Sequence, residues 1–199
     1  LGLLATSLDL ALRRRPDVPE LTAALKDAQR EAERIARLAG RITTLQTLAR
    51  SLQRQPIDLA PVVRHAWQAA LPQATQRGLK LELAAPASLP MRGDAAALEL
   101  ALGELLANAL RASRFGGRVV LTAARHGALV HLSVMDEGPG IPRDRRRVAF
   151  EPFSHGAHAW SPAGTGLAIV REVARGHGGT ASVEDTEVGA TVLLELPAE

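Results

Sequence analysis

Hydrophobic and polar positions divide the chain into two parts with different periods. Up to about residue 54, apolar residues recur every three or four positions, which is the period of an amphipathic helix. From residue 55 onward, helical periods alternate with short segments in which apolar and polar residues take turns, as they do in half-buried strands. The pattern predicts a helical part over residues 1–54 and a mixed α+β domain over residues 55–199.

The N-terminal part is predicted to be a helical hairpin. Residues 1–15 have a helical period, and Pro16 and Pro19 mark a turn, because proline cannot continue helical hydrogen bonding. Residues 18–54 are predicted to form a long second helix. Its apolar seam requires a partner, which predicts a four-helix homodimer of two hairpins. Packing of the seam against the following domain is the alternative.

The second part is predicted to alternate strands and helices. The predicted strands are 57–59, 79–83, 119–124, 129–135, 180–185 and 190–196, and the predicted helices are 61–76, 95–112 and 166–176. Residues 142–163, rich in proline, glycine and arginine, are predicted to be a loop or lid. Adjacent strand pairs indicate a mainly antiparallel mixed sheet with helices on one face. The fold class is therefore a two-layer α/β sandwich.

Composition narrows the range of functions. The chain has 199 residues and no cysteine, so it has neither disulfides nor thiolate chemistry. Its net charge is only +3 and its basic residues are spread out, which argues against nucleic acid as a partner. No apolar run approaches the ~20 residues that a membrane helix needs. Since residue 1 is Leu, we expect a piece of a longer protein, with any membrane anchor upstream.

Asp136 is a candidate ligand-binding carboxylate. It ends a segment, residues 130–136, in which apolar and polar residues alternate. Because alternate strand residues share a face, Asp136 is predicted to point inward with the apolar ones. A buried carboxylate is costly unless donors satisfy it, and the exocyclic amine of adenine is a suitable donor. An ordinary acid that caps a turn is the alternative.

Two glycine pairs flank the predicted lid. Gly138 and Gly140 permit backbone angles that side chains forbid and let a ligand approach closely. Gly164 and Gly166 open a predicted helix, whose first amides lack helical partners and can bind phosphate. Each pair taken alone is equally typical of a tight loop or a hinge.

A polar stripe follows the predicted helix over residues 95–112. Glu104 and Asn108 are four residues apart, so they share a helix face, and Arg111 continues it. Beside a triphosphate, an amide oxygen and a carboxylate suit Mg²⁺, which prefers oxygen ligands. A solvated helix face is the alternative. Four arginines crowd the predicted lid, and a lid over ATP could use one of them to contact phosphate: Arg143, Arg145, Arg146 and Arg147.

Together, these segments resemble the ATP-binding domain of bacterial sensor histidine kinases, within the ATPase superfamily of gyrase, heat-shock chaperone, kinase and mismatch-repair proteins. The similar motifs are Glu104–Arg111 (N box), Asp136–Ile141 (G1 box), Phe150–Phe153 (F box), Gly164–Leu167 (G2 box), and the ending His177–Gly179, Gly189–Thr191 and Leu196–Pro197. The resemblance covers about residues 55–199. It implies a Bergerat-type ATP-binding fold, preceded by part of a dimerisation hairpin.

The resemblance also implies roles for the matched residues. Asp136 would bind the adenine amine with Thr191 nearby, and Asn108 would hold Mg²⁺. Phe150 and Phe153 would anchor the lid and gate its movement. The residues expected to contact ATP are Asn108, Arg111, Asp136, Gly138, Gly140, Ile141, Phe150, Phe153, Gly164, Thr165, Gly166, Leu167 and Thr191.

The chain departs from the family pattern in three places. It has no motif of the type His-Glu/Asp-Leu-Arg-Thr-Pro, which carries the family's phosphoacceptor histidine, so that histidine is expected before Leu1. Glu104 stands where the family usually has Asn; the wider superfamily uses Glu there as a hydrolytic base, which makes Glu104 a catalytic candidate beside Asn108. The step Arg111-Ala112 lacks the usual aromatic residue beside adenine, so weaker nucleotide binding is expected.

By this resemblance, we expect the ATP-binding part of a protein-histidine kinase. It would pass the γ-phosphate of ATP to a histidine outside residues 1–199, for relay to an aspartate on a response regulator receiver domain. The chain alone would bind ATP and Mg²⁺ without phosphorylating itself. The expected setting is the cytoplasmic side of a bacterial inner-membrane protein. The alternatives are an ATP hydrolase that uses Glu104 to activate water, and a degenerate nucleotide-binding or protein-interaction module.

Overall fold

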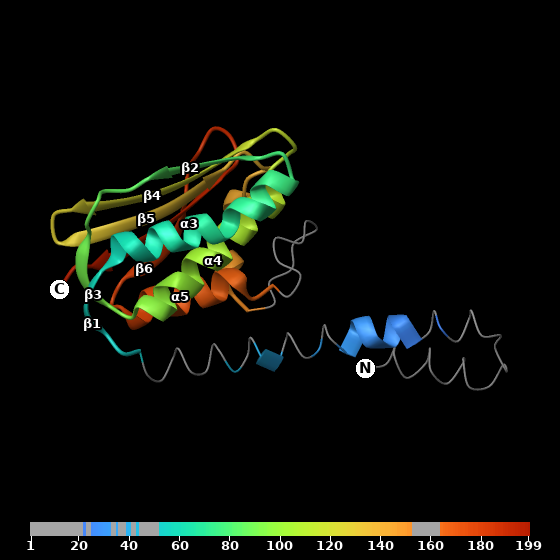
Figure 1. Cartoon of the computed structure of the whole chain (residues 1–199), viewed down its shortest axis with the longest axis horizontal. Helices are drawn as coiled ribbons and strands as arrows, with labels where there is room; N and C mark the ends of the chain where they lie inside the picture. The colour runs from blue at the N-terminus through green and yellow to red at the C-terminus, as the bar shows by residue number, and fades with distance from the viewer. Residues whose placement is uncertain are drawn as a thin grey trace. The chain divides into compact units, whose positions relative to one another are not determined.

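The computed structural model divides the chain into two compact units, Leu1–Thr43 and Thr44–Glu199 (Figure 1). The residues it describes are 22, 25–32, 35, 39, 40, 43, 52–152 and 164–199. Residues 25–32 of the first unit are helical, which agrees with the helix predicted over residues 18–54, but residues 52–54 at its predicted end are not helical. The rest of the predicted hairpin, with its turn at Pro16 and Pro19, lies outside the described residues. Among the described helices, none has the length and hydropathy to cross a membrane.

The second unit is built on a five-stranded sheet in the order β2-β4-β5-β7-β6. The strands are β2 (Lys80–Ala84), β4 (Arg118–His126), β5 (Leu129–Asp136), β6 (Thr180–Glu184) and β7 (Ala190–Pro197). All neighbours are antiparallel except β2 and β4, which run parallel. The mainly antiparallel mixed sheet predicted from the sequence is therefore confirmed.

A second, two-stranded sheet lies beside it. Strand β1 (Gln55–Asp58) pairs antiparallel with β3 (Pro90–Gly93). The sequence predicts β1 but not β3. A proline at one end and a glycine at the other leave β3 only two ordinary strand residues, too few to show a period.

Three helices cover one face of the large sheet, as Figure 1 shows: α3 (Leu59–Gln76), α4 (Ala95–Ala112) and α5 (Gly166–Gly176). Asp58 and Asp94 cap α3 and α4. Each aspartate uses Oδ1 to accept a backbone N–H of the first helical turn, at 3.0 Å from Ala60 and 3.1 Å from Ala97. The cap explains why the predicted and observed bounds of α4 coincide.

The hydrophobic core lies between these helices and the inner face of the sheet. Leu98, Leu102 and Leu105 project from α4 and are buried, as are Val134 of β5 and Leu194 of β7. Burial of each such side chain contributes roughly 1.5–3 kcal/mol. The opposite face of β5 carries half-exposed residues. Polar groups placed at the ends of the inner face are therefore held in a rigid, apolar frame.

A buried histidine joins the C-terminal end of α5 to the N-terminal end of α4. His177, at the C-cap of α5, accepts the backbone N–H of Asp94 on Nε2 at 2.9 Å and donates from Nδ1 to the carbonyl of Val173 at 2.7 Å. Asp94 Oδ2 also accepts the N–H of Gln53 at 3.0 Å, and Arg54 donates to the carbonyl of His177 at 3.1 Å. Residues 53 and 54 are thus tied to α4 and α5.

Candidate functional site

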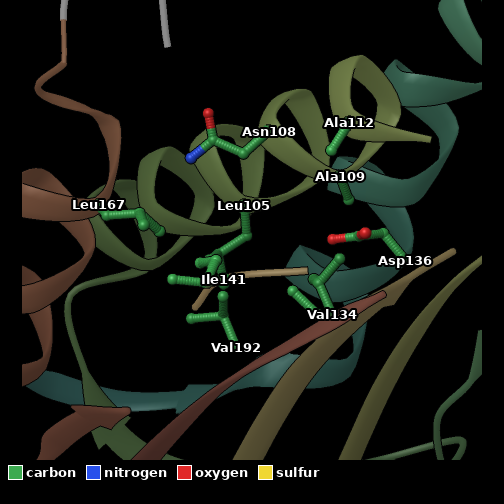
Figure 2. A pocket seen from close by; sticks show the side chains of 10 residues that line it. Leu105, Asn108, Ala109, Ala112, Val134, Asp136, Ile141, Leu167 and Val192 are labelled. Atoms are coloured by element: carbon green, nitrogen blue, oxygen red, sulfur yellow. The ribbon is translucent and has the colours of Figure 1, made fainter. Parts of the chain in front are cut away.

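A pocket opens between α4 and the inner face of β5 and β7 (Figure 2). It encloses about 370 Å³, counting the space at its open mouth. It is lined by Leu105, Asn108, Ala109, Ala112, Val134, Asp136, Ile141, Leu167, Ala190 and Val192. All but Asn108 and Asp136 are apolar. An apolar slot with two polar groups suits a flat ring that has a polar edge.

Asp136 lies at one end of this pocket, opposite Leu167 (Figure 2). It is the last residue of β5 and points to the same side as Val134, with 7% of its surface exposed. Its Oδ1 accepts the backbone N–H of Gly138 at 2.8 Å. Burial raises the pKa of Asp136, and backbone hydrogen bonds from Gly138 and Ala190 offset part of that rise. The inward orientation predicted from strand alternation is what the structure shows.

Three glycines let the backbone close tightly around Asp136. A β-carbon on Gly138 would come 2.7 Å from Asp136 Oδ1 and 2.8 Å from the carbonyl oxygen of Ala112. Gly140 has a φ of +74°, and a β-carbon there would lie 2.6 Å from the carbonyl oxygen of Gly189. On Gly189 it would lie 1.7 Å from the Asp136 carbonyl oxygen. Side chains are excluded at all three positions.

The other end of the pocket joins α4 to the start of α5. Asn108 accepts a hydrogen bond from Arg111 on Oδ1. Its Nδ2 is buried and has no hydrogen-bond partner among the described residues. A β-carbon on Gly166 would come 2.7 Å from Glu104 Oε2 and 3.2 Å from Asn108 Nδ2. The structure therefore brings Gly166 against Glu104 and Asn108, which lie far from it in sequence.

The segment after the G1-like motif is anchored in the core. Within the predicted loop over residues 142–163, the structure has two short 3-10 helices, η1 (Arg143–Arg145) and η2 (Val148–Phe150). Phe150 is buried in the core and does not line the pocket. Glu151 accepts from Arg171 of α5 at 2.6 Å, and this ion pair lowers the pKa of Glu151. Phe153 lies outside the described residues.

Four of the predicted contact residues line the pocket: Asn108, Asp136, Ile141 and Leu167. Gly138, Gly140 and Gly166 border it through the close backbone approaches above. Gly164 has a φ of +61°, which favours glycine, and Thr165 is buried at the N-cap of α5. Arg111 does not line the pocket, but it donates a hydrogen bond to Asn108, which does.

Like Phe150, Thr191 was expected to contact the ligand, but the structure does not place it in the pocket. In the β5–β7 ladder Thr191 lies opposite Met135, whereas Ala190 lies opposite Asp136. Residues directly opposite each other share a face, so the Thr191 side chain is on the other side of the sheet from Asp136. Ala190 is the β7 residue beside the acid. Counting the two-residue period back from Val192 would have found this from the sequence.

Comparison with known proteins places this site in a family. The model of the "Histidine kinase-, DNA gyrase B-, and HSP90-like ATPase" family matches residues 93–199. The chain belongs to this family. It is 36% identical to the sensor-type histidine kinase PrrB of Mycobacterium leprae over 204 residues, covering 100% of this chain and 43% of that protein. It is 32% identical to the alginate biosynthesis sensor protein KinB of Pseudomonas aeruginosa, covering 94% and 33%.

Solved structures of histidine kinases have the same fold as this chain. The ATP-binding domain of PrrB from Mycobacterium tuberculosis aligns over 73% of this chain and 98% of that chain, with a TM-score of 0.61 and 31% identity. Full-length ShkA in complex with AMPPNP aligns over 98% of this chain and 42% of that chain, with a TM-score of 0.76 and 25% identity. The predicted resemblance to sensor histidine kinases and the predicted fold are confirmed. The chain spans less than half the length of the curated relatives named above.

Proposed function

We propose that the pocket binds ATP and that the chain is the ATP-binding catalytic part of a sensor histidine kinase. The γ-phosphate held here passes to a histidine outside residues 1–199 and from there to an aspartate of a response regulator. The observation that carries the proposal is the buried carboxylate of Asp136, which faces an otherwise apolar slot (Figure 2). Neither the hydrolase nor the interaction-module alternative accounts as well for relatives that are named sensor kinases.

Asp136 recognises the base in this proposal. A carboxylate accepts hydrogen bonds and cannot donate them, so it favours the exocyclic amine of adenine over the carbonyl oxygen of guanine. Val134, Ala190 and Val192 of the sheet face the Leu105–Ala109 side of α4, which leaves a slot for the ring. The ionised acid is costly in this apolar setting, and the amine offsets part of that cost.

The phosphates lie toward Asn108 and the first turn of α5. The free N–H groups and positive dipole end of a helix N-terminus favour anions, and Gly166 lets that turn lie against Asn108. Mg²⁺ usually takes one or two protein oxygens and completes its shell with phosphate and water. Asn108 would hold Mg²⁺ through the lone pair of Oδ1 that Arg111 does not use, while its Nδ2, which has no partner among the described residues, suits a phosphate oxygen. When bound, Mg²⁺ neutralises charge on the phosphates.

Transfer of the γ-phosphate requires alignment and charge neutralisation more than covalent help from the protein. Here the residues of the chain hold the two ends of the nucleotide: Asp136 fixes the base, and Asn108 with the α5 N-terminus fixes the phosphates. Glu104 borders the phosphate end, where it orients the groups around Asn108. The apolar walls exclude water from the base.

Three further features belong to the proposal. Residues 1–54 form a homodimer through the predicted hairpin seam, within a larger protein whose other segments anchor it to the bacterial inner membrane. The receiver domain of a response regulator is the protein partner. A structure of the histidine kinase ThkA with the response regulator TrrA shares this fold, with a TM-score of 0.78 and 20% identity. That structure supports the choice of partner class.

The test is titration of the chain with AMPPNP, with and without Mg²⁺, by calorimetry. Asn108→Ala removes the proposed metal and phosphate contact, so Mg²⁺-dependent binding should be lost while the fold is kept. Gly103→Ala is the matched control: it lies on α4, and nothing lies within 4 Å of a β-carbon there. A folded wild-type chain that does not bind AMPPNP would refute the proposed function. In the longer protein, phosphotransfer unchanged by Asn108→Ala would refute the role of Asn108.

A further inference from the structure

We infer that Arg146 is a positioning residue for the adenine end of the pocket, where it acts through Ile141 and is held in place by Asp185. This inference rests on the proposed function, because it concerns the same pocket. It assigns Arg146 to the wall around the base and not to the phosphates.

Arg146 joins the pocket wall to a distant loop. Its Nε donates to the carbonyl oxygen of Ile141 at 3.1 Å, and its Nη1 donates to Asp185 Oδ1 at 2.5 Å. Only 23% of its side chain is exposed, compared with 81% for Arg143, which also reaches Asp185 at 3.2 Å. Arg143 and Arg146 therefore share one acidic partner, and within the described part of the chain Arg146 is the one of the two that bonds to Ile141.

Ile141 is where this contact acts on the pocket. Its side chain is buried and lines the slot together with Val134 and Val192. It follows directly on the glycine turn that closes around Asp136. The Ile141 carbonyl bond to Arg146 therefore sets how closely this wall approaches the base.

The loop between β6 and β7 is the support behind the wall. Asp185 supplies the carboxylate, and Thr186 donates to the carbonyl oxygen of Gly189 at 3.1 Å. That same oxygen is the atom that a β-carbon on Gly140 would strike. The turn before Ile141 thus rests on this loop at Gly189 and is tied to it again through Arg146.

The direction of the Arg146 guanidinium distinguishes support of the pocket wall from binding of phosphate. Its Nε and Nη1 point to Ile141 and Asp185, and the Asp185 carboxylate balances its charge. The pKa of Asp185 is lowered first of all by its hydrogen bond to Arg146. An arginine held in this way supports the wall, whereas an arginine that bound phosphate would direct its charge to the nucleotide.

The two roles predict different patterns of affinity. Loss of one supporting hydrogen bond corresponds to a dissociation constant about three- to tenfold larger. If Arg146 supports the wall around the base, Arg146→Gln should weaken the binding of adenosine, ADP and AMPPNP by the same factor. If it touched phosphate, the factor would grow with each added phosphate.

The experiment measures the dissociation constants of adenosine, ADP and AMPPNP by calorimetry in the whole chain with Mg²⁺. The variants are Arg146→Gln, Arg146→Lys, Asp185→Ala and the double variant Arg146→Gln with Asp185→Ala. In Arg146→Gln we expect the affinity for the three ligands to fall by the same factor. In Arg146→Lys, which retains one of the two bonds, the fall should be smaller. The double variant should be no worse than Arg146→Gln, because both changes break one network. Arg143→Gln is the matched control, with less than about a twofold change expected.

The possible outcomes separate the inference from the function. A wild-type chain that binds none of the three ligands defeats the proposed function. A wild-type chain that binds, with losses for Arg146→Gln that increase from adenosine to AMPPNP or are absent, overturns the inference alone. Thermal melting checks the fold of every variant. Should Arg146→Gln not fold, Asp185→Ala decides the matter, because it alters an exposed side chain and breaks the same link.

Discussion

Gly166, the first residue of α5, lies directly against Glu104 of α4: a β-carbon on Gly166 would fall 2.7 Å from Glu104 Oε2. Real side chains do not tolerate so short a contact, so with alanine at this position the Glu104 carboxylate would have to move aside. The same atom would stand 3.2 Å from Asn108 Nδ2. The placement of the Glu104 and Asn108 side chains at the phosphate end therefore depends on the absence of one methyl group.

We expect Gly166→Ala to weaken AMPPNP binding by about tenfold, the equivalent of ~1.4 kcal/mol, because the displaced Glu104 and Asn108 side chains would no longer be aligned with the phosphates. Adenosine, which has no phosphate, should bind nearly as well as to the wild type. Calorimetric titration with both ligands checks this, with Gly103→Ala as control. Equal loss for adenosine and AMPPNP would show that the substitution disturbs the whole pocket and not its phosphate end.

Asp136→Asn should separate stability from binding. The pKa of Asp136 is raised by burial, so the folded state holds this proton more tightly than the unfolded state does. The ionised carboxylate therefore destabilises the fold, and the penalty develops as pH rises from the unfolded pKa through the raised folded pKa. Above the raised folded pKa the penalty is complete. Asn removes it and keeps an oxygen for the Gly138 N–H.

The expected result is an unchanged or higher melting temperature, with AMPPNP binding about 10- to 100-fold weaker, because a hydrogen bond to a charged acceptor is worth ~1.5–3 kcal/mol. Thermal melts and calorimetry on the same preparation check both parts. AMPPNP binding by the wild type should also weaken as pH falls. Because the pKa of Asp136 is raised, this weakening should begin at a higher pH than it would for an ordinary aspartate. A variant that melts lower and binds normally would contradict the assignment of Asp136.

His177 should make the fold sensitive to acid. Burial lowers its pKa, although Val173 and Asp94 offset part of this effect. The unfolded state therefore binds this proton more readily, and stability is lost as pH falls below about 6.5 toward the folded pKa. The slope from one such proton is at most ~1.4 kcal/mol per pH unit. Urea unfolding between pH 5 and 8 should show a shallower slope in His177→Gln, and an identical slope in both proteins would speak against this role.

Ala112→Tyr should tighten nucleotide binding. Ala112 lines the pocket at the end of α4, where the family pattern has an aromatic residue. Stacking of a ring on a base is worth ~1–3 kcal/mol, so a gain of at least about threefold in affinity for adenosine is expected. Competition of adenosine against a fluorescent nucleotide measures it. Weaker binding of adenosine would mean that the small side chain is needed for the base to enter.

The sequence predicts the elements of the second unit well, because their signals are local. Asp94 marks the start of α4, and the apolar period then continues unbroken to Ala112. The parallel pairing of β2 with β4 could not be predicted, since a strand's period does not reveal its partner. Strand β3 was missed because only Met91 and Arg92 lie between its proline and its glycine.

The candidate site was predictable where one strand or one helix carries the geometry. Strand alternation oriented Asp136, and helical spacing placed Asn108 beside Glu104. The family motif predicts that Thr191 lies near adenine, but the ladder register puts it on the opposite face of the sheet. Arg146 belonged to a run of arginines usually read as solvated. Its partner Asp185 is 39 residues away, and no local pattern joins the two.

Gly189 also limits how the loop between β6 and β7 can be altered. Val188, immediately before it, is 64% exposed, and Glu187 is exposed as well. Reporter tags, short insertions or randomised libraries therefore have room at Glu187 and Val188. At Gly189, the next position, any side chain would drive β7 away from β5 and open the pocket beside Asp136. The tolerance of this hairpin to engineering should therefore end abruptly between Val188 and Gly189.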